Sequence, residues 1–265
     1  MTINRTHAQY DMSPTTFSPE GRIYQVEYAS KAVENSPTAI GVSCKDGVIL
    51  AAEKIIRSKF LLETSNRRIL IADTHVGVAM AGLVADGRKL AKETRRACST
   101  YLQNYGEKIP PQTLSGQIGG MVHAYTCYGA YRPFGTSLLL ASYDHCNKAY
   151  ELYNVDTFGV SLKYFHCAIG KGQQSAKTDV ERAGFEKMTC REALKYVAKI
   201  LYVAHDDKED KPFVLEMGWI CDESNQKFVR VPEDLRVEAD KWAAEQTKED
   251  EDDDEEDKDD EDDDI

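Results

Sequence analysis

The stretch FSPEGRIYQVEYASKAVEN, residues 17–35, predicts a helix ahead of any strand pattern. Ser18 can accept a hydrogen bond from a free backbone N–H of the first turn, and Pro19 suits the first helical position because it has no N–H to lose. We therefore expect the helix to begin at Pro19. At 100° per residue its apolar side chains occupy most of the circumference. An arc this wide favours burial against two bodies, and burial within a single domain is the alternative.

The charge of the chain is concentrated at its C-terminal end. Residues 248–265 hold 15 acidic residues and 2 lysines, out of 45 acidic and 33 basic residues in the whole chain. Residues 1–247 are therefore close to neutral and offer no general basic field, so no nucleic acid is expected as a partner. The acidic run repels itself and buries nothing, which predicts a disordered tail. It is either a solubilising extension or a docking site for basic partners.

Seven cysteines are scattered along the chain without a C-x-x-C pair: Cys44, Cys98, Cys127, Cys146, Cys167, Cys190 and Cys221. An odd number of cysteines without an apolar leader indicates reduced thiols, so we expect the protein in the cytoplasm and nucleus. No apolar run reaches the length of a membrane span, and no membrane partner is expected.

Strand-like and helix-like blocks alternate along the remaining chain. Residues 38–54 give two apolar runs separated by Lys45-Asp46-Gly47, which is a hairpin signal. Strand patterns continue at 67–82, 135–144, 148–156, 160–170, 213–223 and 227–233, and helical patterns lie at 83–106, 110–131, 172–184, 189–207 and from Pro232 to about Thr247. Helices that arrive in pairs between groups of strands predict an α/β protein of the α+β type, built as a four-layer αββα sandwich.

A set of short motifs runs through this pattern: Tyr10-Asp11, FSPEGR at 17–22, QVEYA at 25–29, TAIG at 38–41, AGLVAD at 81–86, RPFG at 132–135 and AIG at 168–170. Together they resemble the α-type subunits of the proteasome over residues 10–247. KAVENS at 31–36, HAYT at 123–126, MTCR at 188–191 and the acidic tail resemble one subtype within that family. The resemblance implies the amino-terminal nucleophile hydrolase fold, with a gate segment at 1–16, the sandwich domain at 17–247 and the tail at 248–265.

The resemblance also implies a role for the first helix. In α subunits this helix lies across the top of the sandwich and contacts neighbours in a seven-membered ring. The inter-subunit contacts implied for this chain come from Ile23, Tyr24, Val26 and Ala29. The implied partners are other α subunits, β-ring subunits, regulatory or activator particles and unfolded polypeptide in transit.

The residues ahead of this helix form, in the family, gate segments over the pore through which substrate enters. The cluster that fixes the open gate would consist of Tyr10, Asp11, Pro19 and Tyr28. Met12 stands where many α subunits carry Arg, so a bidentate partner for a carboxylate is missing here.

Catalysis is not expected of this chain. The related β subunits use an N-terminal threonine, freed by processing, whose own α-amine acts as base. By the same resemblance the position of that nucleophile falls on Pro37, one residue before Thr38. The assisting carboxylate aligns with Glu53 and the catalytic lysine with Arg68, which is too basic to shuttle protons. The expected role is therefore that of a non-catalytic subunit of a threonine-type endopeptidase complex.

Arg68 also aligns with the lysine that receives the C-terminal carboxylate of an activator. Arginine is larger and prefers a planar two-point contact, so we expect weak or absent insertion of the activator's C-terminus there.

Two other functions are left open: a self-processing hydrolase that exposes Thr38, and a binding protein that acts through its acidic tail. His123 and Cys127 have the spacing of half a zinc site, but no second pair matches it, so neither a metal nor a cofactor is expected.

Overall fold

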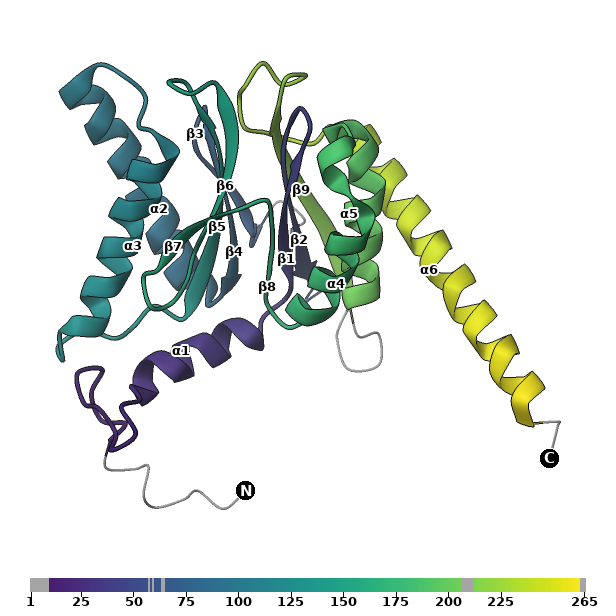
Figure 1. Cartoon of the computed structure of the whole chain (residues 1–265), viewed down its shortest axis with the longest axis horizontal. Helices are drawn as coiled ribbons and strands as arrows, with labels where there is room; N and C mark the ends of the chain where they lie inside the picture. The colour runs from purple at the N-terminus through teal and green to yellow at the C-terminus, as the bar shows by residue number, and fades with distance from the viewer. Residues whose placement is uncertain (1–9, 57, 59, 63–64, 206–211, 263–265) are drawn as a thin grey trace.

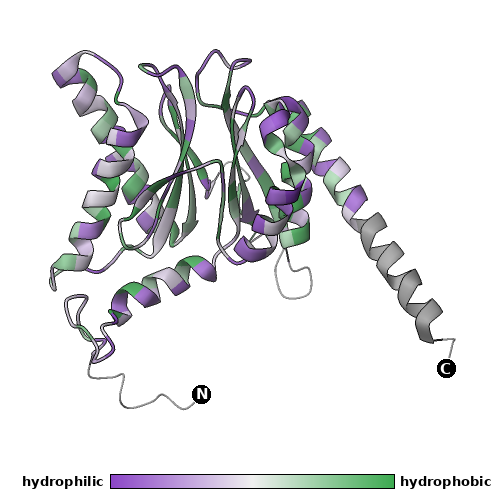
Figure 2. Cartoon of the chain, in the orientation of Figure 1, coloured by the Kyte–Doolittle hydropathy of each residue, from purple (hydrophilic) through white to green (hydrophobic). Residues whose placement is uncertain are grey.

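The structure is a computed structural model that describes residues 10–56, 58, 60–62, 65–205 and 212–262, with 248–262 described by their backbone only. Its strands form two antiparallel sheets stacked face to face, and helices cover the two outer faces (Figure 1). Strongly polar residues gather on the outer faces of the helices, while apolar residues dominate the strands between them (Figure 2). This arrangement is the predicted αββα sandwich.

The first sheet has the strand order β10-β9-β2-β1-β8. Its strands are β1 Ala39–Cys44, β2 Gly47–Ile55, β8 His166–Ile169, β9 Phe213–Cys221 and β10 Val229–Arg230. The second sheet has the order β3-β4-β5-β6-β7. Its strands are β3 Ile69–Asp73, β4 Val76–Gly82, β5 Thr136–Asp144, β6 Ala149–Val155 and β7 Ser161–Tyr164.

Each predicted helix is present, although the bounds of α1 and α6 differ; α1 lies across one end of the sandwich and the other helices form the two outer layers. The helices are α1 Tyr24–Glu34, α2 Val84–Tyr105, α3 Pro111–Cys127, α4 Gln173–Ala183, the short 3₁₀ helix η2 Phe185–Lys187, α5 Cys190–Ala204 and α6 Glu233–Asp262. Helices α2 and α3 pack on the second sheet, α4 and α5 pack on the first, and α6 packs against α5. Gly106 ends α2 in the left-handed region, as its place in the sequence predicts.

The predicted hairpin at residues 38–54 is confirmed as β1 and β2. Its turn is Lys45-Asp46, because Cys44 pairs with Gly47 as the last rung of the ladder. A side chain at Gly47 is excluded, since its Cβ would lie 2.3 Å from the carbonyl oxygen of Ile220 in the neighbouring β9. Glycine is therefore needed here for strand packing rather than for the turn itself.

The single strand predicted at 160–170 is wrong, because it divides into β7 and β8, which belong to different sheets. The chain changes sheets at Phe165, whose carbonyl oxygen accepts a hydrogen bond of 2.8 Å from the N–H of Ser43, beside the paired strands β1 and β8. The alternating pattern continues through this crossing, so periodicity alone does not reveal it.

The end of α6 also differs from the sequence expectation. The backbone stays helical beyond Thr247, through acidic residues for which the sequence predicts disorder. Helical backbone hydrogen bonds are local, so a helix whose first part is packed can extend without further packing.

Among the described residues, none of the helices has the length and apolar character needed to cross a membrane.

Candidate functional site: the α1 end of the sandwich

Helix α1 lies across one end of the sandwich and packs against β4 and β5 (Figure 1). Its inward face is formed by Tyr24, Val26, Ala29 and Val33, all of which are buried. Tyr28, Lys31 and Glu34 form the exposed face. The helix is thus held to the body along its whole length.

The first turn of α1 begins at Tyr24 and not at Pro19, so the predicted helix start is wrong. Ser18 does accept a backbone hydrogen bond, but from the N–H of Arg22 at 3.1 Å, and it thereby closes a turn over residues 18–22. Gly21 accounts for the difference, because its φ of 78° lies in the left-handed region and interrupts a helix.

The structure brings together two of the four residues predicted for the gate cluster. The Tyr28 hydroxyl donates to the Asp11 carboxylate at 3.4 Å, and the Gln25 amide donates to the Asp11 backbone carbonyl. Partial burial and the nearby Asp11 charge raise the pKa of Tyr28, so its hydroxyl stays protonated and able to donate. Tyr10 is half-buried and Pro19 exposed, and the described contacts join neither of them to this pair.

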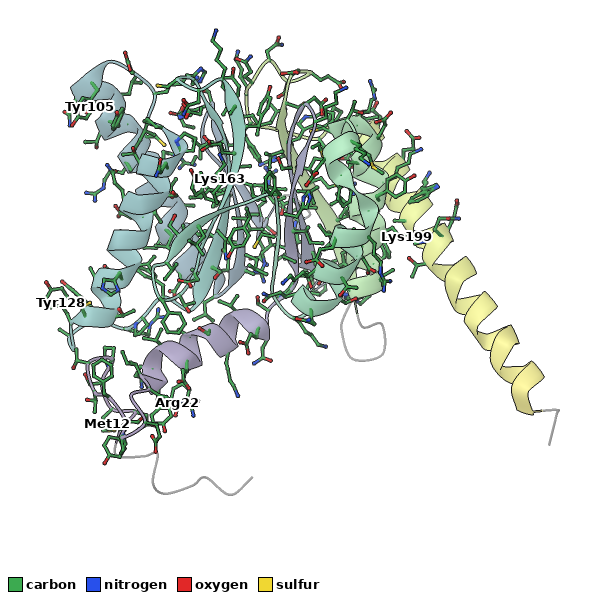
Figure 3. All side chains as sticks on the ribbon, in the orientation of Figure 1. Met12, Arg22, Tyr105, Tyr128, Lys163 and Lys199 are labelled. Atoms are coloured by element: carbon green, nitrogen blue, oxygen red, sulfur yellow. The ribbon has the colours of Figure 1, made fainter. Side chains whose placement is uncertain are left out.

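Pro14 and Ser18 of the segment before α1 are buried, while two further attachments of this segment lie at the surface. Arg22 donates from Nε to Glu27 at 2.7 Å and lies over the ring of Tyr24, 5.4 Å from its centroid. Met12 is 83% exposed, and Figure 3 shows it near Arg22 at the outer end of this segment. Exposed ion pairs contribute little to stability, so the segment is held weakly compared with the helix.

Three of the four residues implied to contact a neighbouring subunit are core residues of this chain. Tyr24, Val26 and Ala29 are buried against the chain's own sheets, and Ile23 is half-buried. The inter-subunit role implied for them stays a prediction, and within the single chain their side chains pack against its own body. The buried part of the apolar arc is the inward face of α1, which packs against β4 and β5 of the second sheet.

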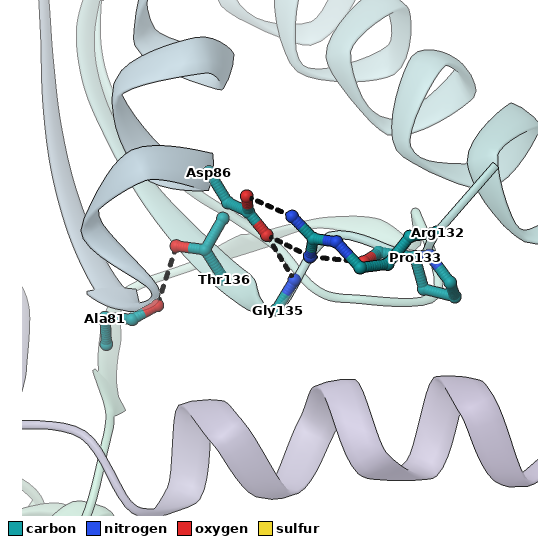
Figure 4. A network of polar contacts seen from close by, with 6 residues as sticks. All are labelled: Ala81, Asp86, Arg132, Pro133, Gly135 and Thr136. Atoms are coloured by element: carbon teal, nitrogen blue, oxygen red, sulfur yellow. Dashed lines mark hydrogen bonds and ion pairs between the residues drawn. The ribbon is translucent and has the colours of Figure 1, made fainter.

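Beside α1, a polar network joins two of the motifs that carry the family resemblance. Arg132 donates two hydrogen bonds of 2.7 Å to the carboxylate of Asp86 at the start of α2. The backbone N–H of Gly135 donates to the same carboxylate at 3.0 Å, and Thr136 donates to the carbonyl of Ala81 at 2.8 Å (Figure 4). The sequence marks these motifs, but it does not show that they meet.

The network ties the start of α2 to the loop before β5, on the side that faces α1. Burial alone would raise the pKa of the Asp86 carboxyl, but the hydrogen bonds from Arg132 and Gly135 outweigh it and the pKa lies below its usual value. Gly135 packs close to α1, because a Cβ on it would lie 3.6 Å from that of Ala32. The Asp86–Arg132 pair therefore shapes the surface that receives the helix.

The residues aligned with a peptidase centre lie in the interior, at the start of β1. The N–H of Thr38 donates to Glu53 at 3.2 Å, and the Thr38 hydroxyl accepts from the N–H of Gly172 at 3.1 Å. Burial raises the pKa of Glu53 above its usual value, although the hydrogen bond from Thr38 opposes this. His205 Nδ1 is 3.7 Å from the same carboxylate.

Arg68 is also an interior residue, with 4% of its surface exposed. Its guanidinium donates to the carbonyl of Gly82 at 3.3 Å, and its backbone N–H donates to Glu216 at 2.7 Å. The side chain therefore presents no exposed cation to an arriving carboxylate in the isolated chain.

The sequence reading missed an apolar strip along the edge of the second sheet. Its exposed large side chains are Phe158, Val160, Leu162, Tyr164 and Phe165. Strand β7 is the last strand of its sheet, so its outer backbone groups have no strand beside them within the described chain. The alternating apolar residues at 158–164 were the sequence signal for this strip. Alternation alone does not show whether the apolar face of the strand packs on the core or is exposed.

Comparison with known proteins identifies the family. Residues 10–32 match the N-terminal signature of A-type proteasome subunits, and residues 33–220 match the proteasome subunit family. The chain belongs to the α-type subunits of the proteasome family. The signature covers the turn at 18–22 and most of α1, the two features described above.

Several relatives of the chain carry the name alpha type-3, and others, such as the 41% identical protein of Saccharomyces cerevisiae, are named as probable alpha type-7 subunits. The alpha type-3 proteasome subunit of Spinacia oleracea is 48% identical over 87% of this chain and 92% of its own length. The alpha type-3 proteasome subunit of Acanthamoeba castellanii is 48% identical over 91% of this chain and 95% of its own length. The protein of the same name from Dictyostelium discoideum is 44% identical, over 91% and 96%.

Proposed function

We propose that this chain is a non-catalytic subunit of the α ring of a proteasome core particle. It holds the ring together, forms part of the substrate-entry gate and takes part in activator docking, in ubiquitin-dependent and ubiquitin-independent protein degradation in the cytoplasm and nucleus. Its partners are other α subunits, β-ring subunits, regulatory or activator particles and unfolded polypeptide in transit. Membership of the family and the names of the relatives support this assembly.

The gate proposal is carried by the one-sided attachment of the N-terminal segment. Helix α1 is buried along its inward face, whereas residues 10–22 reach it through contacts such as that of Tyr28 with Asp11. A segment anchored at one end can lie across an opening that several subunits share. Residues 1–9, the first part of the proposed gate segment 1–16, lie outside the described residues.

Catalytic silence is supported by the surroundings of Thr38. A threonine nucleophile of this fold uses its own free α-amine as base. The nitrogen of Thr38 belongs instead to a peptide bond with Pro37 and donates to Glu53. A self-processing hydrolase requires cleavage of that bond. We expect Thr38→Ala to leave peptide turnover of the assembled particle unchanged, and turnover lost with assembly intact would favour the self-processing alternative.

Ring assembly needs a lateral surface, and the strip along β7 is suited to that role. Apolar side chains there are exposed in the single chain, and a neighbour of the same fold would bury them. On the opposite side of the molecule the sheets end in β3 and β10. We propose that the β7 edge is a contact between adjacent α subunits.

For activator docking, the buried position of Arg68 supports weak or absent insertion at this pocket. A complex with the C-terminal carboxylate of an activator bound to Arg68 would contradict this part of the proposal. The acidic residues 248–265 are proposed to serve as a solubilising extension or to dock basic partners, and their removal should leave assembly unchanged.

The experiment that tests the gate is deletion of residues 2–9. We expect native-gel mobility of the particle to be unchanged, because α1 keeps its buried anchor, and basal hydrolysis of small peptides to rise without an activator. Deletion of residues 249–265, at the other end of the chain, is the control and should change neither. Loss of assembly on removing residues 2–9, or unchanged hydrolysis, would contradict the proposal.

A further inference from the structure

A cleft opens on the side of the molecule where the two sheets end in β7 and β8. Its volume is about 430 Å³, and it is lined by residues of β6, β7, β8, α4 and η2. Strand β7 is the last strand of the second sheet and β8 the last strand of the first, and the chain passes from one to the other through Phe165 (Figure 1). The cleft therefore adjoins the apolar strip that we propose as a contact between α subunits.

The strand register explains why the cleft stays open. Leu152 of β6 belongs to the core between the sheets, and Tyr164 of β7 pairs with it, so their side chains lie on the same face of the second sheet. Tyr164 is nevertheless 37% exposed, because β7 packs against β6 and α3 and is not covered by the first sheet. The second sheet thus overhangs the first at this edge, and its inner face is open there.

Two buried polar atoms of the lining residues have no hydrogen-bond partner in the described part of the chain. They are Oδ1 of Asn154, from β6, and Nδ1 of His166, from β8. Burial lowers the pKa of His166, so its ring is neutral and Nδ1 can accept a hydrogen bond. Buried acceptors without a donor are unfavourable, which favours a donor supplied from outside the chain.

The charged groups around the cleft favour a cation. Glu181 of α4 and Glu186 of η2 line it, and both are exposed. Neither carboxylate takes part in an ion pair with another residue that the structure describes. Lys177 is the one cationic side chain of the described lining, so two carboxylates and one ammonium group leave a net charge of −1.

Two aromatic side chains form the outer part of the lining. They are Tyr164 and Phe165, and Phe165 is 71% exposed. The faces of aromatic rings attract cations, and arginine stacks on them more readily than lysine does. A guanidinium also carries five N–H donors, which suits carboxylates and unsatisfied acceptors together. An apolar or acidic group would leave these acceptors unpaired.

We propose that the cleft between β7, β8 and α4 receives a cationic side chain, arginine or lysine, of the adjacent α subunit. This inference rests on the proposed place of the chain in an α ring. In a closed ring of subunits with the same fold the contact is head-to-tail, so the β7 edge of one subunit meets a different surface of the next. The apolar strip provides buried area there, and the cleft adds a charged contact that discriminates between neighbours.

The direct test is an electron cryo-microscopy structure of the assembled particle with the full chain. We expect a guanidinium or ammonium nitrogen of the adjacent α subunit within about 4 Å of a carboxylate oxygen of Glu181 or Glu186. A chain that lies in the α ring with its cleft open to solvent, or filled by a neutral or acidic group, would overturn this inference and leave the proposed ring position intact. A chain that is absent from the ring would overturn both.

A charge-neutral variant tests whether the contact holds the subunit in place. Glu181→Gln/Glu186→Gln keeps the size of both side chains and removes both charges. We expect the rate at which this subunit leaves the particle in urea, followed by native mass spectrometry, to rise roughly tenfold or more, because losing one partner of a charged contact acts on dissociation. The control Asp234→Asn/Glu245→Gln removes two exposed carboxylates of α6 and should leave the rate unchanged. Equal release rates in the two variants would overturn the proposal. All four positions are exposed, so both variants should fold, as soluble yield would show.

Discussion

Helix α1 and the segment before it adjoin in sequence, yet the body holds them in opposite ways. Along α1, the side chain of Val26 is 1% exposed and that of Tyr24 5%. In residues 10–22, by contrast, the contacts to α1 include a tyrosine–carboxylate bond of 3.4 Å, the bond from Gln25 to the Asp11 carbonyl and an exposed pair between Arg22 and Glu27. Burial of apolar surface is worth far more than exposed polar contacts. The difference separates the buried helix α1, the anchor, from the segment that we propose to move, and each prediction below tests one side of it.

Substitution on the buried side should have the largest effect. Val26→Asp would place an unpaired carboxylate in the core, which costs about 3–5 kcal/mol. We expect the chain to fail to fold or to enter the ring, as measured by soluble yield and native-gel mobility. The control is Lys31→Asp, which introduces the same group on the exposed face of the same helix. If both variants lose soluble yield equally, the assignment of the two faces is wrong.

Substitutions in the Asp86–Arg132 network, which shapes the surface that receives α1, should have the next largest effect on stability. Arg132→Met removes both hydrogen bonds to Asp86 and leaves a largely buried carboxylate with the Gly135 N–H, so we expect a loss of about 1–3 kcal/mol in the free energy of unfolding. Urea unfolding measures it. Arg182→Met is the matched control, because its pair with Asp179 is 3.9 Å long and exposed. An equal loss in the control would mean that the Asp86–Arg132 contact contributes no more to the free energy of unfolding than an exposed ion pair does.

How far the sequence predicts this site depends on the distance over which its parts interact. The strand pairs, α2 and α3 follow from periodicity and local turn signals, since Lys45-Asp46 and Gly106 act on their own neighbours. The predicted start of α1 at Pro19 is wrong because Ser18, with Gly21 in the left-handed region, forms a local turn that competes with a helix cap. Contacts such as Asp86 with Arg132, or the burial of Val26, join distant segments and appear only in the folded chain.

The ion pair between Asp86 and Arg132 should make the free energy of unfolding depend on pH. The folded pKa of Asp86 lies below its unfolded value of about 3.9, so its contribution is complete above that pH and is lost as the pH falls through the folded pKa. We expect the difference in unfolding free energy between the native chain and Asp86→Asn to shrink as the pH falls from 6 to roughly 3. Urea titrations over this range measure it. A difference that grows on acidification would show that burial, and not Arg132, dominates at Asp86.

The smallest effect is expected on the exposed side of the comparison. Tyr28→Phe keeps the aromatic ring and removes only the hydroxyl that donates to Asp11, a long bond at a residue 46% exposed. A hydrogen bond at such a position contributes about 0.5 kcal/mol or less to the free energy of unfolding, so folding and ring assembly should be unchanged. If the Asp11–Tyr28 contact helps to fix the segment before α1, basal peptide hydrolysis should still change by up to about twofold, because about 0.4 kcal/mol corresponds to that ratio. Tyr105→Phe, an exposed tyrosine at the far end of α2, is the control and should leave hydrolysis unaltered. Lost assembly in Tyr28→Phe would place Tyr28 in the anchor rather than in the movable segment, since an exposed hydroxyl alone cannot account for so large an effect.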